Sequence, residues 1–179
     1  IGSKHEISDW PGAISKAAEG LSRFKGEEVA VIGSGRMTNE ELHLLRRLAD
    51  TLETDLLSLV PRVEESDGKL ISADRNPNTS GAKLIWASRN PYAKLESIRQ
   101  GVVDGKIKAL IVFYEDLLGD AQFKADDLAN LDVLVSNHIL TNGTAKASDV
   151  VLPGAGFAEK RGSLVNITGR LQRLNQAIS

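Results

Sequence analysis

Short runs of apolar, often β-branched residues alternate along this chain with segments that repeat apolar residues at helical spacing. The runs lie at 29–32, 56–60, 109–113, 131–135 and 150–152, and 109–113 (ALIVF) is the strongest buried-strand signal. Continuous apolar runs of this length are typical of strands buried on both faces, and their alternation with helices is typical of a parallel sheet. We therefore expect an α/β fold, Rossmann-like and doubly wound, with a mainly parallel sheet and helices on both faces.

The expected helices carry boundary signals of their own. Asp9 is a candidate N-cap, and Pro11 falls in the first turn, where proline is tolerated. Thr38 and Glu41 have the spacing of a capping box, in which each side chain accepts a hydrogen bond from the other residue's backbone N–H. Gly105 has the position of a helix stop after a periodic segment. The apolar stripes are Trp10, Ile14, Ala17, Ala18 and Leu21 in the first helix, and Leu42, Leu45, Leu48, Ala49 and Leu52 in the second.

Length and composition fit a single domain. The chain has 179 residues, of which 41% are hydrophobic, and this is enough to enclose one core. We therefore expect residues 1–179 to form one α/β domain. Because the chain starts at Ile1 rather than at methionine, we also expect it to be a piece of a longer polypeptide. The formal net charge of -2, with basic and acidic residues interspersed, predicts no nucleic-acid partner.

Residue types that hold redox centres are scarce. Cysteine is absent, so the chain offers no thiolate for an iron-sulfur cluster, a disulfide or nucleophilic catalysis. No apolar run approaches the ~20 residues that span a bilayer, and the first residues lack the apolar core of a secretory signal. We expect a cytoplasmic chain with no direct membrane insertion.

Two short patterns resemble functional motifs but are incomplete. The Gly-Ser-Gly sequence at 33–35 falls between a strand and a helix, where backbone amides can bind phosphate. The dinucleotide fingerprint needs a third glycine where this chain has Thr38, which favours a plain tight turn. Glu40 and His43 have the spacing of one arm of a di-iron site, but a second arm is missing, so we interpret His43 as a solvated helix residue and assign no metal. Without a Gly-x-Ser-x-Gly elbow, hydrolase chemistry is unsupported, and we assign no catalytic residue.

The stretch 61–90 is rich in Pro, Gly, Asn and Asp and has few apolar residues. Loops this long are uncommon inside compact domains unless they bind something. We expect a long loop at 61–90 that contacts a partner, with disorder as the alternative.

The C-terminal part contains short blocks in a fixed order: TA at 144–145, SDVVLP at 148–153, EKRGS at 159–163 and NITGRLQ at 166–172. This succession resembles the molybdopterin oxidoreductase family, in which similar blocks close the region that binds a pterin dinucleotide. Gly143, Arg161 and Thr168 differ from the family's usual residues at their positions. Upstream, ADRNPNTSGA at 73–82 is similar to a segment of one branch of that family, the large iron-sulfur subunit of respiratory NADH:quinone oxidoreductase.

The resemblance implies one of two roles. The first is a structural and docking lobe of a NADH:quinone oxidoreductase subunit of the respiratory chain, without a redox centre of its own. Iron-sulfur clusters would then lie in another part of the parent chain. The partners would be other subunits of the complex, contacted through 61–90 and the basic run 170–173, and the complex would hold the chain at the periphery of the inner membrane. The fragment alone would not be catalytic.

The second role is the cofactor-binding lobe of a molybdenum oxidoreductase, such as a formate dehydrogenase, that uses a bis-pterin guanine dinucleotide. The resemblance then implies that molybdopterin guanine dinucleotide contacts Thr144, Asp149, Asn166, Arg170 and Gln172. The planar guanidinium of Arg170 can pair with a phosphate, and its alternatives are a salt bridge or a helix cap. A freestanding nucleotide-binding module built on 33–35 is a third possibility.

Overall fold

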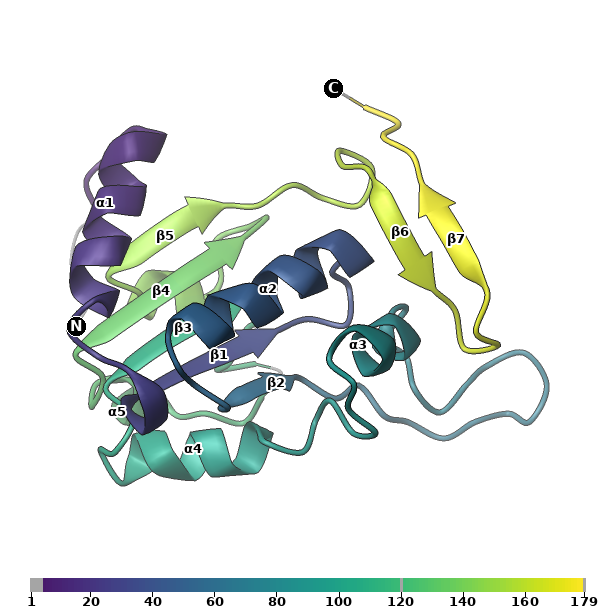
Figure 1. Cartoon of the computed structure of the whole chain (residues 1–179), viewed down its shortest axis with the longest axis horizontal. Coiled ribbons are helices and arrows are strands. Elements are labelled where there is room, and N and C mark those ends of the chain that lie inside the picture. The colour runs from purple at the N-terminus through teal and green to yellow at the C-terminus, as the bar shows by residue number, and fades with distance from the viewer. Residues whose placement is uncertain (1–4, 120, 179) are drawn as a thin grey trace.

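A five-stranded parallel sheet forms the centre of the molecule (Figure 1). The structure is a computed structural model that describes residues 5–119 and 121–178. Its sheet order is β2-β1-β3-β4-β5, and every pairing is parallel. The strands are β1 (Val29–Gly33), β2 (Leu57–Leu59), β3 (Ala109–Phe113), β4 (Val133–His138) and β5 (Val150–Pro153).

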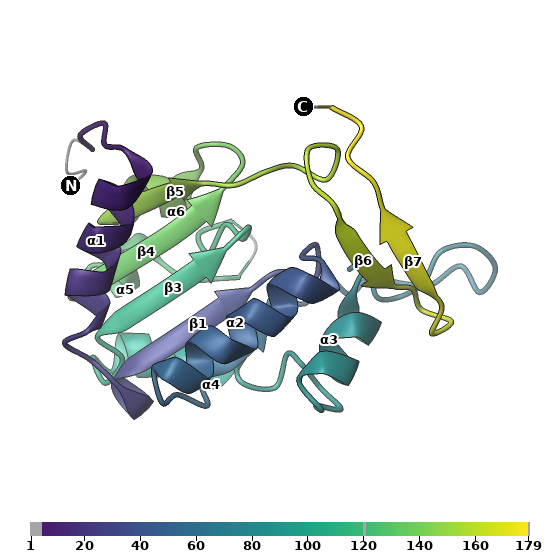
Figure 2. The same ribbon diagram turned by 45° about the horizontal axis from the view of Figure 1, so that its top comes forward.

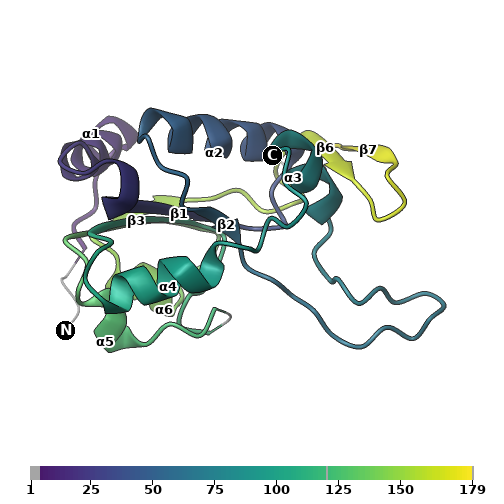
Figure 3. The same ribbon diagram turned by 60° about the horizontal axis from the view of Figure 1, so that its bottom comes forward.

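Helices cover both faces of the sheet, as Figure 3 shows. On one face lie α1 (Trp10–Leu21) and α2 (Asn39–Thr51), and on the other lie α4 (Leu95–Val103), α5 (Ala125–Leu128) and α6 (Gly143–Ala147). A 3₁₀ turn, η1 (Gly26–Glu28), precedes β1. The expected doubly wound α/β fold is confirmed. Its strand order is 2-1-3-4-5, the second common order of doubly wound sheets, rather than the 3-2-1-4-5 of dinucleotide-binding domains.

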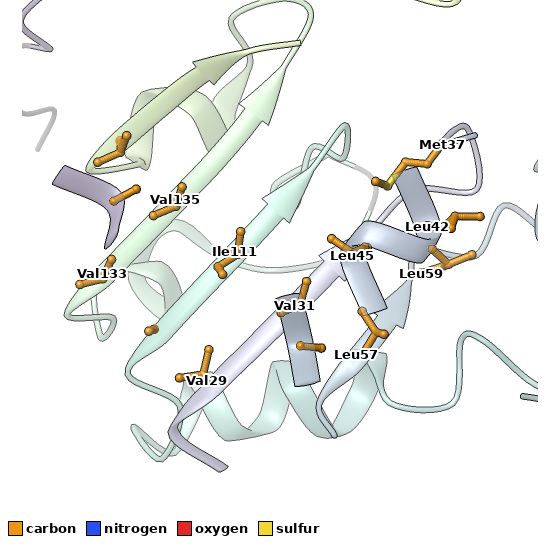
Figure 4. Packing of buried hydrophobic residues seen from close by; sticks show 14 of the residues in the cluster. Val29, Val31, Met37, Leu42, Leu45, Leu57, Leu59, Ile111, Val133 and Val135 are labelled. Carbon is orange, nitrogen blue, oxygen red and sulfur yellow. The ribbon is translucent and has the colours of Figure 1, made fainter. Parts of the chain in front are cut away.

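Alternate residues of each strand enter two separate apolar cores. In β1, Val29 and Val31 belong to the core beneath α2, while Ala30 and Ile32 belong to the core above α4. Figure 4 shows the first core, in which Leu45 of α2 lies over the strands among Met37, Leu42, Leu57, Leu59 and Ile111. Because strand side chains point alternately to opposite faces, a strand with helices on both sides is expected to be mainly apolar along its whole length. This arrangement explains the apolar runs of the sequence.

The predicted helix boundaries of α1, α2 and α4 are confirmed. The Asp9 side chain accepts a hydrogen bond from the Gly12 N–H at 2.9 Å. Glu41 N donates to Thr38 Oγ1 at 3.3 Å and Thr38 N donates to Glu41 Oε2 at 2.7 Å, which completes the capping box. Gly105 follows α4 at a φ of 66°, a conformation that glycine adopts without strain.

The apolar stripe expected in α1 is wrong for Trp10, Ile14 and Ala18, which are exposed, whereas Leu21 is partly buried against the core. Trp10 is 52% and Ile14 is 53% exposed, and only Ala17 is buried. The reason is position: among the strands of the sheet, α1 contacts mainly β4 and the partly exposed edge strand β5, so less of its surface is covered than that of a helix over the centre of the sheet.

Two elements project from the sheet region. Residues 61–78, called the arm below, leave β2, fold back at an isolated antiparallel bridge between Val63 and Asp74, and enter α3 (Thr79–Ile85) (Figure 3). The stretch 61–90 therefore contains a helix as well as a loop. The antiparallel hairpin of β6 (Gly162–Val165) and β7 (Leu171–Leu174) contacts α2 and α3 through β6 (Figure 2).

Candidate functional site

The carboxyl ends of β1 and β3 define the place where this fold can hold a ligand. From β1 the chain continues to β2 on one side and later to β3 on the other, so the strand order reverses between these two strands. Open α/β sheets bind ligands in the crevice that such a reversal creates. The residues directly after these strands, 34–38 and 114–119, are therefore the first candidates for a site.

The Gly-Ser-Gly turn after β1 is filled by the protein's own side chains. All three residues, 33–35, are buried. A Cβ at Gly35 would lie 2.5 Å from the Asn76 side chain, and one at Gly33 would lie 2.5 Å from Leu45 Cδ2. The glycines are thus required for the close approach of neighbouring side chains, which supports the interpretation as a plain tight turn.

A buried ion pair closes the crevice on the β3 side. Glu115, the second residue after β3, is fully buried, and its two carboxylate oxygens accept hydrogen bonds from Arg62 Nη1 at 2.8 Å and Nη2 at 2.6 Å. The Arg62 side chain is 17% exposed and lies at the root of the arm. Bidentate pairing of this kind fixes geometry as well as charge. The pair therefore anchors the arm to the centre of the sheet.

A second polar cluster ties the arm to the loop before α4. Tyr92 Oη contacts Asp74 Oδ2 at 3.0 Å, Asn76 Nδ2 at 3.2 Å and Thr79 Oγ1 at 2.7 Å. Asn76 Nδ2 also donates to the Val60 carbonyl at 3.0 Å. Burial, reinforced by the Asp74 carboxylate, raises the pKa of Tyr92 despite the hydrogen bonds from the other two side chains. The tyrosine therefore stays protonated and acts as a structural hydrogen-bonding group.

The segment 154–161 crosses the same edge of the sheet on its way from β5 to the hairpin (Figure 1). Lys160 Nζ donates to both carboxylate oxygens of Glu41 at 2.8 and 2.9 Å, and it lies 4.6 Å from the centre of the Tyr114 ring. Tyr114 has a φ of 60°, which is rare for a non-glycine residue, at the first position after β3. Burial, followed by the negative charge of Glu41, raises the pKa of Tyr114 to about 12.

Thr144, the first of the five residues tied to a dinucleotide by resemblance, is committed to the interior. It is fully buried, its Oγ1 donates to Asp116 Oδ1 at 2.9 Å, and the same hydroxyl accepts from Leu117 N at 2.7 Å. The Thr144 backbone N–H also donates to Asp116 Oδ1, at 3.1 Å. Burial alone would raise the pKa of Asp116, but the hydrogen bonds from Thr144 and neighbouring backbone groups lower it below its ordinary value.

The other four residues occupy two further places. Asp149 lies at the amino-terminal edge of the sheet, where its Oδ2 accepts from Leu134 N at 2.8 Å. Asn166 forms the hairpin turn, with its Oδ1 accepting from Arg170 N at 2.9 Å and from Thr168. Arg170 and Gln172 are exposed on the same hairpin. The structure therefore brings the last three residues together and leaves Thr144 and Asp149 at opposite edges of the sheet.

This arrangement does not fit a complete pterin-dinucleotide site. The crevice is occupied by Asn76 and by the Arg62–Glu115 pair, and the Thr144 hydroxyl is already used by two protein partners. Of the five residues, only Arg170 and Gln172 present side chains without a hydrogen bond or ion pair among the described residues. Binding a large polar ligand requires several convergent donors, and these two residues on one hairpin do not supply them.

The sequence pattern of the molybdopterin oxidoreductase family matches residues 63–179. The chain belongs to the molybdopterin oxidoreductase family. Members of two kinds are similar to it over parts of its length. The matching part of the family pattern begins with the arm and ends after the hairpin, so it includes both projecting elements.

Formate dehydrogenases form the first group of relatives. The F420-dependent formate dehydrogenase 1 subunit alpha of Methanococcus maripaludis is 45% identical over 51 residues, which are 28% of this chain and 8% of that protein. The putative formate dehydrogenase YrhE of Bacillus subtilis is 38% identical over 80 residues, or 43% of this chain and 8% of that protein.

The second group consists of NADH-quinone oxidoreductase subunits. The G subunit of the NADH-quinone oxidoreductase of Shewanella oneidensis is 36% identical over 102 residues, which are 55% of this chain and 11% of that protein. The chain thus spans only 8% to 11% of the length of these family members. No helix among the described residues of this family member is long and apolar enough to cross a membrane.

Sequence reasoning missed the residues that occupy the crevice. Glu115 lies two residues after the strongest strand signal, and a charge at the end of a buried parallel strand is a usable indication of a site. Its partner Arg62 lies 53 residues earlier, and nothing in the spacing links the two. His43 is exposed on α2, as expected.

Proposed function

We propose that this chain is a structural and docking lobe of a NADH:quinone oxidoreductase subunit of the respiratory chain, with no redox centre of its own. The similarity to the G subunit of NADH-quinone oxidoreductase supports this assignment, since it covers 55% of the chain. The iron-sulfur clusters that carry electrons lie, in this proposal, elsewhere in the parent polypeptide. The complex holds the lobe on the cytoplasmic side, peripheral to the inner membrane.

The observation that carries the proposal is the occupied crevice. A catalytic lobe of a doubly wound fold needs an accessible space where the strand order reverses. Here the two carboxylate oxygens of Glu115 are bonded to Arg62, and Asn76 lies against Gly35. A buried ion pair thus fills part of this space, which supports a scaffold role over a cofactor site.

The arm supplies a docking surface for the proposed complex. Its tip is shaped by Asp67 Oδ1, which accepts from the backbone N–H groups of Lys69, Leu70 and Ile71 at 2.8–2.9 Å. These hydrogen bonds lower the pKa of Asp67, so the carboxylate stays charged. Leu70 is 94% exposed on this ordered tip. An apolar side chain displayed on a locally bonded turn is suited to a pocket on a neighbouring subunit.

The test removes the tip without disturbing its root. Because Glu64 N donates to the Ala73 carbonyl at 2.9 Å beside the Val63–Asp74 bridge, residues 65–72 can be replaced by an Asn-Gly turn. The full-length parent subunit with this replacement should fold but fail to enter its complex, as seen in native gels and in NADH:quinone reductase activity of isolated membranes. Leu84→Ser is the matched control, because Leu84 is a 70% exposed leucine on α3 outside the arm. Normal assembly of the tip-deleted subunit would refute the docking role.

One observation favours a second candidate, the cofactor-binding lobe of a molybdenum oxidoreductase such as a formate dehydrogenase. Arg170 and Gln172 are exposed on the hairpin, within the segment that matches the family pattern. In this candidate they contact molybdopterin guanine dinucleotide together with Asn166, and Thr144 and Asp149 support the lobe from inside. Calorimetric titration with GTP decides: binding that is lost in Arg170→Ala favours this candidate, and stoichiometric molybdenum in the purified parent protein would establish it.

A further inference from the structure

The two edges of the β6–β7 hairpin are not equivalent. The outer edge of β6 is covered by side chains from α2 and from the residue before α3. Ser163 N donates to Glu40 Oε2 at 2.9 Å, and Val165 N donates to Asn78 Oδ1 at 2.8 Å. Asn39 Nδ2 adds a hydrogen bond to the Ser163 hydroxyl at 3.0 Å. The hairpin is therefore fixed to the start of α2 and to the N-cap of α3 through one of its strands.

The outer edge of β7 has no such cover among the described residues. At the turn, Asn166 N donates to the Arg170 carbonyl at 3.0 Å. Bonded and non-bonded pairs alternate along an antiparallel ladder, and the register pairs Leu171 with Val165 and Arg173 with Ser163. The backbone N–H and C=O groups of Leu171 and Arg173 therefore point away from β6. They form an open edge on which another strand can add.

The charged side chains of β7 and its flanking residues are basic, and one carboxylate, Glu40, lines the hollow that Arg161, Leu171 and Arg173 share. Residues 160–179 contain no aspartate or glutamate. Lys160 is neutralised by Glu41, whereas Arg161, Arg170 and Arg173 are exposed and have no ion pair among the described residues. Leu171, between the last two arginines, is 66% exposed. The edge thus presents basic and apolar side chains together with free backbone groups.

We propose that the β7 edge binds an extended acidic segment of a partner polypeptide by strand addition. Carboxylates of that segment pair with the three arginines, and its apolar side chains contact Leu171. A second copy of this chain is disfavoured as the occupant, because pairing of two β7 edges would bring two sets of arginines together, and residues 160–179 contain no carboxylate side chain to neutralise them. This inference rests on the proposed docking function and names the chemistry of one partner segment.

The experiment measures binding of short labelled peptides to the whole chain by fluorescence anisotropy. A peptide that alternates glutamate and valine should bind, and its affinity should fall as salt is added. The same peptide with N-methyl groups on alternate amides should lose binding, since it cannot complete the strand pairing. A lysine-valine peptide should not bind, because its charges repel those of the edge.

Variants locate the site. Arg170→Gln and Arg173→Gln should each weaken the glutamate-valine peptide roughly two- to five-fold, the range expected for exposed ion pairs. Arg47→Gln, at an exposed arginine on α2, is the matched control and should leave binding unchanged. Leu171→Pro removes one outward N–H and should abolish binding while circular dichroism shows an intact fold.

Three results would overturn the proposal. Equal binding of the plain and N-methylated peptides would mean charge attraction without strand addition. Absence of binding by the acidic peptide would mean that the arginines only prevent edge-to-edge aggregation. Sedimentation of the chain as a dimer that Leu171→Pro dissociates would assign the edge to a second copy. The arm-deletion test is independent of these three results, because it measures the effect of the arm on complex assembly and does not involve β7.

Discussion

Removing the guanidinium that faces Glu115 should be among the most damaging single changes in this chain. In Arg62→Met the Glu115 carboxylate, 0% exposed and bonded at 2.8 and 2.6 Å, would lose both of its charged donors. Breaking a buried ion pair in this way costs about 3–5 kcal/mol. The Arg62 side chain is 17% exposed, so water can reach the vacated space. The free energy of unfolding should therefore fall by about 3 kcal/mol, the lower end of this range. For a domain of this size that corresponds to a fall in Tm of roughly 6–12 °C.

Urea unfolding followed by circular dichroism measures this loss as a change in midpoint at constant m-value. The matched control is Arg99→Met, which breaks an equally bidentate pair with Glu96 on the surface of α4 and should cost far less, because solvent screens the pair. The double variant Arg62→Met with Glu115→Leu should recover much of the stability, because no uncompensated charge is left behind. Equal losses in the buried and the surface variant, or strictly additive losses in the double variant, would refute the reasoning.

Three further changes test how the hairpin and α2 are held. Gly162→Ala would place a Cβ 2.6 Å from Thr38 Cγ2, so it should lower the free energy of unfolding by about 1–3 kcal/mol in urea melts. Thr38→Ala removes the acceptor of the Glu41 N–H and should cost about 1 kcal/mol by the same measurement. Burial raises the pKa of Glu40, but its own N–H and the Ser163 groups lower it below 4.5, so its contribution is present above that value and is lost as pH falls through the lowered pKa. The protection factors of the hairpin amides, which correct for the intrinsic pH dependence of exchange, should therefore fall on acidification, and this fall should be absent in Glu40→Gln.

Four strands of the sheet were predictable because they are largely buried on both faces, and the partly exposed edge strand β5 was predictable from its apolar run. The expected runs 29–32 and 109–113 match β1 and β3 within one residue, and 150–152 matches β5. A strand of this kind is recognisable locally, since most of its positions are expected to be apolar. The starts of α1 and α2 were also predictable from nearby residues, because the Asp9 and Thr38 side chains accept hydrogen bonds from backbone N–H groups three residues later. Local chemistry thus determines the elements that the sequence analysis identified.

Features that depend on distant partners could not be predicted in this way. The β6–β7 hairpin was missed because its strands are short and exposed on one side, and its stability comes from Glu40 and Asn78, which lie far away in sequence. The exposure of Trp10 depends on where α1 meets the sheet edge, and this position is not encoded in the helix itself. For the site, the family resemblance placed Thr144 and Arg170 in one group, whereas the fold puts one in the core and the other on the hairpin.

The contacts that close the crevice also position the two projecting elements. Arg62 lies at the root of the arm and bonds to Glu115, while Lys160 lies at the root of the hairpin and bonds to Glu41 beside Tyr114. Both ion pairs meet the edge of the sheet where β3 ends. A ligand entering the crevice would have to displace these pairs and would thereby release the arm and the hairpin. Under the docking proposal, the same two ion pairs that fill the crevice would keep the arm and the hairpin in fixed positions, and cofactor binding in the crevice would compete with that role.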